Sequence, residues 1–133
     1  MNESLSSWLA LREPADFAAR SATLADATAR RLDAADPVRV VDLGTGTGSN
    51  LRYLIDRLPR RQEWLLVDRD RRLLDELTDR MQAWAIARGY EVGREGDVLT
   101  IHRDGRESTI ATRQLDLGVL ADDEIFRGRH LVT

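Results

Sequence analysis

The fold is decided by the stretch VRVVDLGTGTG, residues 38–48. Its first six residues form a short, apolar and largely β-branched run, which is typical of a buried strand. The alternating glycines at 44–48 predict a tight turn directly after it. Residues 50–58 carry apolar side chains at helical spacing and are followed by Pro59, so they predict a helix. A strand, a glycine-rich turn and a helix therefore succeed one another.

The same order of elements recurs in the next thirty or so residues. EWLLVD, residues 63–68, is a second strand candidate, and the apolar stripe across residues 73–84 predicts a second helix that ends near Gly89. Strand, helix, strand, helix is the pattern of a parallel sheet with crossover connections. Beyond it, residues 97–102 and 107–114 predict a β-hairpin around Asp104-Gly105.

The two ends of the chain differ from this central pattern. Residues 4–34 predict helices, with Pro14 expected at the first position of the second one. Residues 129–133 predict the opening of another strand. We therefore divide the chain into an N-terminal helical segment, residues 1–36, and an α/β part, residues 37–133.

Composition excludes several classes of protein. The 133 residues are 42% hydrophobic and 32% charged, with a net charge of −3, which gives no strong signal for nucleic-acid binding. There is no cysteine and no lysine, and the two histidines are far apart in sequence, so no metal site is predicted. The absence of a long apolar run or a secretion signal predicts a cytoplasmic protein that does not enter the membrane.

The glycine-rich turn is the first candidate binding site. Backbone N–H groups at a strand-to-helix turn are free, and glycine allows a ligand to approach them closely. The spacing is acidic-x-G-x-G-x-G starting at Asp42, whereas a dinucleotide-binding G-x-G-x-x-G would need glycine in place of Ser49. A phosphate-binding P-loop is excluded because no lysine follows.

Two further aspartates stand where nucleotide-binding α/β folds place polar contacts. Asp68 ends the second strand candidate, where a carboxylate can accept hydrogen bonds from both ribose hydroxyls. Asp116 follows the hairpin, within reach of an adenine amine. The structural alternatives are that Asp68 only caps the next helix and that Asp116 is an ordinary loop residue.

Together, residues from about 37 to 117 resemble the class I S-adenosylmethionine-dependent methyltransferases. The resemblance implies that the chain binds S-adenosylmethionine as its cofactor. The residues implied in cofactor binding are Asp42, Gly44, Gly46, Gly48, Asp68, Arg69, Asp116 and Leu117.

The resemblance also implies separate roles for these residues. Asp42 would orient the methionine amino group, directly or through water, and Asp68 would hold the ribose hydroxyls. Arg69 or Asp70 would border the adenine, which Asp116 and Leu117 would bind. The helical N-terminal segment resembles leader helices that fold over the cofactor, in which Arg12 or Arg20 would pair with the methionine carboxylate; the alternative is that both arginines are solvated.

The resemblance implies a Rossmann-like, doubly wound parallel sheet, of which only the first three to four strands are expected here. We therefore expect a fragment that holds a cofactor half without an acceptor half and is inactive alone, with the methyl acceptor and catalytic residues unknown. An exposed central strand would favour a homodimer through the terminal strand or the hairpin. The main alternative is a non-catalytic nucleotide- or S-adenosylhomocysteine-binding module that acts through protein contacts; a dinucleotide-dependent oxidoreductase is disfavoured by Ser49.

Overall fold

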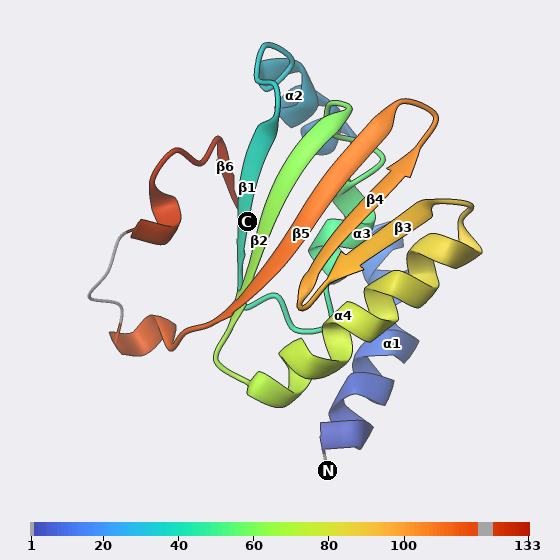
Figure 1. Ribbon diagram of the computed structural model, residues 1–133, viewed down its shortest axis with the longest axis vertical. Coiled ribbons are helices and arrows are strands. Elements are labelled where there is room, and N and C mark those ends of the chain that lie inside the picture. Colours follow the sequence, from blue (N-terminus) through green and yellow to red (C-terminus); the bar gives the residue numbers. More distant parts are fainter. Residues whose placement is uncertain (1, 120–123) are drawn as a thin grey trace.

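A computed structural model describes residues 2–119 and 124–133 as an α/β fold (Figure 1). No helix within these residues is both long and apolar enough to cross a membrane. The elements, in chain order, are α1 (Asn2–Ala19), α2 (Ala22–Arg31), β1 (Val38–Leu43), α3 (Ser49–Leu54), β2 (Arg61–Asp68), α4 (Arg71–Ala87), β3 (Glu91–Glu95), β4 (Val98–Arg103), β5 (Arg106–Gln114), the 3-10 turns η1 (Leu117–Val119) and η2 (Glu124–Phe126), and β6 (Leu131–Val132).

The sheet is mixed and has six strands in the order β3-β4-β5-β2-β1-β6, whereas only the first three to four strands of a parallel sheet, with a hairpin, were expected. The pairs β5-β2, β2-β1 and β1-β6 are parallel, whereas β3-β4 and β4-β5 are antiparallel. The chain thus moves from β1 outward to β2 and β5 and then returns to the other side of β1 as β6. In Figure 1 the C-terminus lies beside β1 and the antiparallel strands lie at the far edge. Strand order therefore reverses at β1, which carries the glycine-rich turn at its carboxyl end.

Strand β3 was missing from the sequence-based expectation, which had only a two-stranded hairpin in this region. Its sequence, EVGRE, is mostly polar and is exposed on both faces except for the half-buried Val92, so it lacks the apolar alternation of a strand. It pairs with β4 at the edge of the sheet, where backbone hydrogen bonds stabilise it. Strands β3 and β6 form the two edges of the sheet. The expected homodimer through β6 or the hairpin would use one of these edges and stays a prediction.

The main core lies between one face of the sheet and the helices. Val40 of β1 is in register with Trp64 of β2, and Trp64 with Ile110 of β5, so these side chains share one face. Leu51 of α3 and Leu77 of α4 are completely buried against them. Burial of each such side chain contributes about 1.5–3 kcal/mol, which explains why this layer fixes the helices on the sheet.

The opposite face of the sheet has a smaller core. Val41, Leu65 and Val67 are covered there by Ile125 of η2. In the residues that the structure describes, α2, α3 and α4 join the main core, and α1 packs on that helical layer, with Phe17 edge-on to Tyr53 of α3. A doubly wound sheet has α-helices on both faces. In the described residues the α-helices cover one face only, and the 3-10 turn η2 covers the other.

The first helix is longer than the sequence predicted. Pro14 was expected to begin a new helix, yet it lies inside α1, which continues to Ala19. A proline inside a helix removes one backbone hydrogen bond but does not always end it. The break comes instead at Ser21, whose hydroxyl oxygen accepts a hydrogen bond from the N–H of Leu24 at 3.1 Å and so caps α2.

Tyr90 predicts a pH dependence of stability in the alkaline range. Burial raises the pKa of Tyr90 to about 12, and the hydrogen bond and charge of Asp56 act in the same direction, against Arg103 and Arg106. The unfolded chain loses this proton near pH 10, whereas the folded protein keeps it to about pH 12. The contribution of Tyr90 to stability is therefore complete below pH 10 and is lost as the pH rises from 10 to 12.

Urea unfolding at a series of pH values tests this expectation. The free energy of unfolding should fall between pH 10 and 12 in the original protein and should fall less steeply in Tyr90→Phe, which has no phenol to titrate. Tyr53→Phe is the control, because it removes the other tyrosine and keeps Tyr90. Equal slopes in the original protein and in Tyr90→Phe would contradict the assignment.

Candidate functional site

The glycine-rich turn lies at the carboxyl end of β1 and adopts the backbone geometry that its sequence predicted. Gly44, Gly46 and Gly48 all have positive φ, of 63°, 57° and 89°. Residues with a side chain rarely adopt this left-handed conformation, so glycine is needed at these points. The N–H of Thr45 donates to the carbonyl of Val67 at 2.9 Å and ties the turn to β2.

Two of the three glycines border open space. A Cβ atom built on Gly44 would have no neighbour within 4 Å, and one on Gly46 would meet only the Cδ1 of Leu9, at 4.0 Å. Gly48 is different, because a Cβ there would lie 3.4 Å from the Nη1 of Arg52 and 3.5 Å from the Sδ of Met81. Gly48 thus packs against the helical layer, whereas Gly44 and Gly46 leave a cradle beside exposed backbone that a bound cofactor could fill.

Asp42 lies beneath this turn and is completely buried. Its carboxylate accepts hydrogen bonds from the Oγ1 of Thr45 at 2.7 Å, the Nδ2 of Asn50 at 2.9 Å and the Oγ1 of Thr133 at 2.7 Å. These donors come from the turn, from α3 and from the residue after β6. Asp42 therefore holds three segments together, and its complete burial keeps its carboxylate from direct contact with a ligand.

Asp68 at the end of β2 faces the same turn. Its Oδ2 accepts from the backbone N–H of Gly46 at 2.9 Å, and its Oδ1 accepts from the N–H of Asp70 at 2.8 Å. The cap of α4 is Asp70, whose side chain accepts from the N–H of Arg72, so the alternative in which Asp68 caps this helix is wrong. A carboxylate has about four acceptor positions, so Asp68 keeps capacity for ligand hydroxyls.

The residues after β5 lie next to Asp68 along the sheet edge. Gln114 is the register partner of Asp68, and the N–H of Leu115 donates to the Asp68 carbonyl at 3.0 Å. Asp116 is exposed and its Oδ1 accepts from the N–H of Gly118 at 2.9 Å, while Leu117 is 38% exposed. The fold thus brings this turn to the Asp68 side of the site, where the Asp116 carboxylate makes a contact within its own turn.

Arg69 extends the same edge of the site. Its side chain is exposed, and its carbonyl accepts from the Nε2 of Gln114 at 3.1 Å, which ties the segment after β2 to the end of β5. The assignment of Arg69 to the border of a ligand site stays a prediction.

The two N-terminal arginines that the resemblance implied for the methionine carboxylate have other partners. Arg12 pairs with Asp16 at 3.3 Å and lies over the ring of Trp8. Arg20 lies over the ring of Tyr53, 4.9 Å from its centroid. It is Leu9 of α1 that approaches the glycine turn.

An ion pair between Glu13 of α1 and Arg52 of α3, which the sequence did not indicate, connects α1 to this turn. Arg52 of α3 is buried, and both of its terminal nitrogens and its Nε are engaged. Its Nε donates to Glu13 at 2.8 Å, its Nη2 donates to the same carboxylate, and its Nη1 donates to the carbonyl of Thr47 at 2.6 Å. Glu13 and Arg52 are 39 residues apart, so no local pattern could reveal the contact.

At one end of the sheet the structure places open space beside Gly44 and Gly46, the carboxylate of Asp68, the apolar side chain of Leu9 and, after β5, the exposed Leu117. Such groups can hold hydroxyl and amino substituents of a nucleoside-sized molecule. Comparisons of this chain with protein-family models, with curated proteins and with solved structures found no match.

Proposed function

We propose that this chain is the S-adenosylmethionine-binding portion of a methyltransferase, built on a Rossmann-like sheet. The observation that carries the proposal is the pairing of three left-handed glycines at the end of β1 with Asp68 at the end of β2. The strand order reverses at β1, and in open α/β sheets ligands bind outside the carboxyl ends of the strands at such a reversal.

Each group at this edge then has a defined task. Gly44 and Gly46 let the adenosyl part lie against the backbone, and Asp68 accepts hydrogen bonds from the ribose hydroxyls. Asp42 holds the turn in the shape that the ligand needs. Arg69, Asp116 and Leu117 border the adenine. When bound, S-adenosylmethionine supplies an activated methyl group, so the protein's contribution is to position it for the acceptor.

A titration series tests the cofactor class. Isothermal calorimetry should show saturable binding of S-adenosylmethionine and S-adenosylhomocysteine and none of NAD. Asp68→Asn should weaken both by about 1–3 kcal/mol, since the amide cannot accept from two hydroxyls as a carboxylate does. Asp75→Asn is the matched control, because Asp75 is an exposed helix residue paired with Arg71. An Asp68→Asn variant that binds as tightly as the control would exclude Asp68 from the site.

A non-catalytic binding module is the second candidate function. The observation that favours it is that the candidate ligand-binding residues lie together, while no residues for a methyl acceptor have been identified. The two candidates differ in turnover. Transfer of a labelled methyl group to any acceptor supports the methyltransferase, whereas tight binding of S-adenosylhomocysteine with no methyl transfer supports the module. Binding of NAD in preference to both would contradict each of them.

A further inference from the structure

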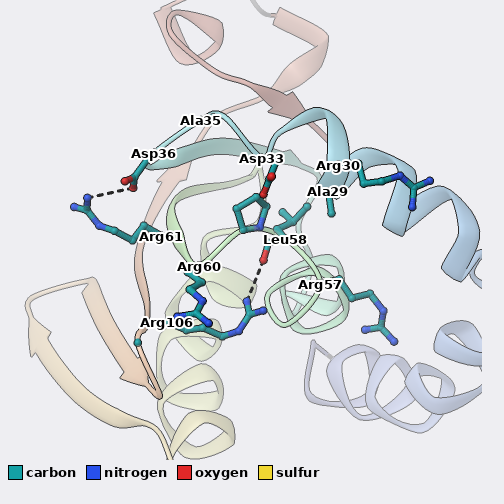
Figure 2. Close-up of a pocket in the computed structure, with 12 residues that line it drawn as sticks. Ala29, Arg30, Asp33, Ala35, Asp36, Arg57, Leu58, Arg60, Arg61 and Arg106 are labelled. Atoms are coloured by element: carbon teal, nitrogen blue, oxygen red, sulfur yellow. Dashed lines mark hydrogen bonds and ion pairs between the residues drawn. The ribbon is translucent and has the colours of Figure 1, made fainter.

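A pocket lies at the opposite end of the sheet from the glycine turn, and neither candidate function uses it. Its volume is about 640 Å³, within the range of small-molecule sites of about 300–1,000 Å³. It is lined where the central strands begin, at Arg61 of β2 and Arg106 of β5, and by the segments that precede β1 and β2 (Figure 2).

The lining of this pocket is strongly basic. It contains the five arginines Arg30, Arg57, Arg60, Arg61 and Arg106. The acidic residues of the lining are Asp33 and Asp36, which leaves an excess of three positive charges. Because the whole chain has a net charge of −3, this local excess is opposite in sign to the rest of the molecule. A pocket of this kind attracts anions against the overall charge of the protein.

Three of the five arginines donate or pair within the protein: Arg61, Arg57 and Arg106. Arg61 pairs with Asp36 at 3.2 Å. Arg57 donates to the carbonyl of Tyr53 and lies 4.0 Å from the centroid of that ring. Figure 2 shows the Arg61 and Arg57 side chains directed away from the centre of the view, Arg61 toward Asp36 and Arg57 on the other side. They frame the pocket rather than fill it.

Arg30 points away from Leu58 in Figure 2. Arg60 and Arg106 are therefore the arginines placed to bind a ligand. Arg106 is fixed by its Nη1, which donates to the carbonyl of Leu58 at 3.0 Å, so its other N–H donors are held in place. Arg60 lies against the hairpin turn just before Arg106, since a Cβ on Gly105 would be 3.4 Å from its Nη1. In the view of Figure 2 both guanidinium groups lie below Leu58. Among the described residues neither has a carboxylate partner.

We propose that this pocket binds a phosphate-bearing small molecule whose diphosphate group is held between Arg60 and Arg106. Two neighbouring cations repel each other until an anion lies between them, and guanidinium groups bind phosphate oxygens in a bidentate manner. The excess of three positive charges in the lining favours a diphosphate over a carboxylate. A single carboxylate would neutralise one of these charges, whereas a diphosphate neutralises two to three. The concave shape and the negative charge of the rest of the chain favour a compact anion over a nucleic-acid strand.

Calorimetric titration with pyrophosphate at low salt tests the proposal. We expect saturable binding that weakens as salt is added, and an approximately tenfold loss of affinity in Arg60→Gln. Arg60 is exposed and its side chain makes no hydrogen bond to any residue that the structure describes, so this variant should keep the thermal stability of the original protein. Arg72→Gln is the matched control, because it removes the same charge from an exposed position on α4. The control should change the affinity by less than about twofold.

Two further arms identify the source of the phosphate. ADP is titrated against the Asp68→Asn variant, so that the proposed adenosyl site does not contribute to binding. If ADP binds and its affinity depends on Arg60, the ligand is a nucleotide. If pyrophosphate binds and ADP does not, the ligand is a free diphosphate. The proposal is overturned if pyrophosphate does not bind at millimolar concentration or if Arg60→Gln and Arg72→Gln behave alike. It is also overturned if only a single-stranded oligonucleotide binds through Arg60. None of these results depends on S-adenosylmethionine binding.

Discussion

Replacement of Asp42 by alanine is expected to lower the free energy of unfolding by about 3 kcal/mol, as measured by urea denaturation. The carboxylate is completely buried and accepts hydrogen bonds from Thr45, Asn50 and Thr133. The substitution leaves these donors without their acceptor. The bond from Thr45 is buried and those from Asn50 and Thr133 are part-buried, and unsatisfied buried groups cost more than the net value of the bonds themselves.

Asp42→Asn separates the charge from the shape. The amide fills the same space but accepts through one oxygen only, so its loss of stability should lie between those of the original protein and the alanine variant. Asp75→Ala is the control, since its exposed pair with Arg71 should contribute less than about 0.5 kcal/mol. If Asp42→Ala were as stable as Asp75→Ala, Asp42 would not be the residue that holds the turn.

Arg52→Met should be comparably destabilising, by about 2–4 kcal/mol, because it breaks a buried ion pair and leaves Glu13 without its partner. The Arg52 side chain is 8% exposed and that of Glu13 is 20% exposed, so water can replace the lost bonds only in part. The substitution also removes the donor to the Thr47 carbonyl within the glycine turn. We therefore expect α1 to become more accessible to protease and to hydrogen exchange, together with weaker binding of S-adenosylmethionine.

A double-mutant cycle distinguishes this contact from a general loss of packing. Glu13→Gln combined with Arg52→Met should cost less than the sum of the two single changes, because the second change no longer strands a charge. Arg12→Met is the control, since Arg12 forms an exposed pair with Asp16 one turn along the same helix. Additive single effects would show that Glu13 and Arg52 do not act as a pair.

The two ends of the sheet thus have different physical characters. At the carboxyl ends of β1 and β2, carboxylates and glycine backbone surround the turn, whereas arginines gather where β2 and β5 begin. A neutral or cationic adenosyl ligand suits the first end, and an anion suits the second. Because the strands separate the two places, the variants Asp68→Asn and Arg60→Gln should each affect one titration and leave the other unchanged.

Local sequence determined the parts of this protein whose conformation depends on neighbouring residues. The β-branched run at 38–43 formed a buried strand, Gly44, Gly46 and Gly48 took left-handed conformations, and the Asp104-Gly105 turn joined β4 to β5. Each of these follows from steric preferences within a few residues. The sequence therefore predicted the α/β class, the glycine turn and the position of Asp68 at a strand end.

Only the tertiary structure decided the features that depend on distant partners. The polar strand β3 forms because β4 offers it an edge, and helix α1 continues through Pro14. Arg52 contacts Glu13, which is 39 residues away in the sequence, and Asp42 contacts Thr133, which is 91 residues away. The same is true of the basic pocket, in which the fold brings Arg30 and Arg106 to the arginines of residues 57–61. Contacts of this kind follow from how the sheet orders its strands, and no local periodicity encodes that order.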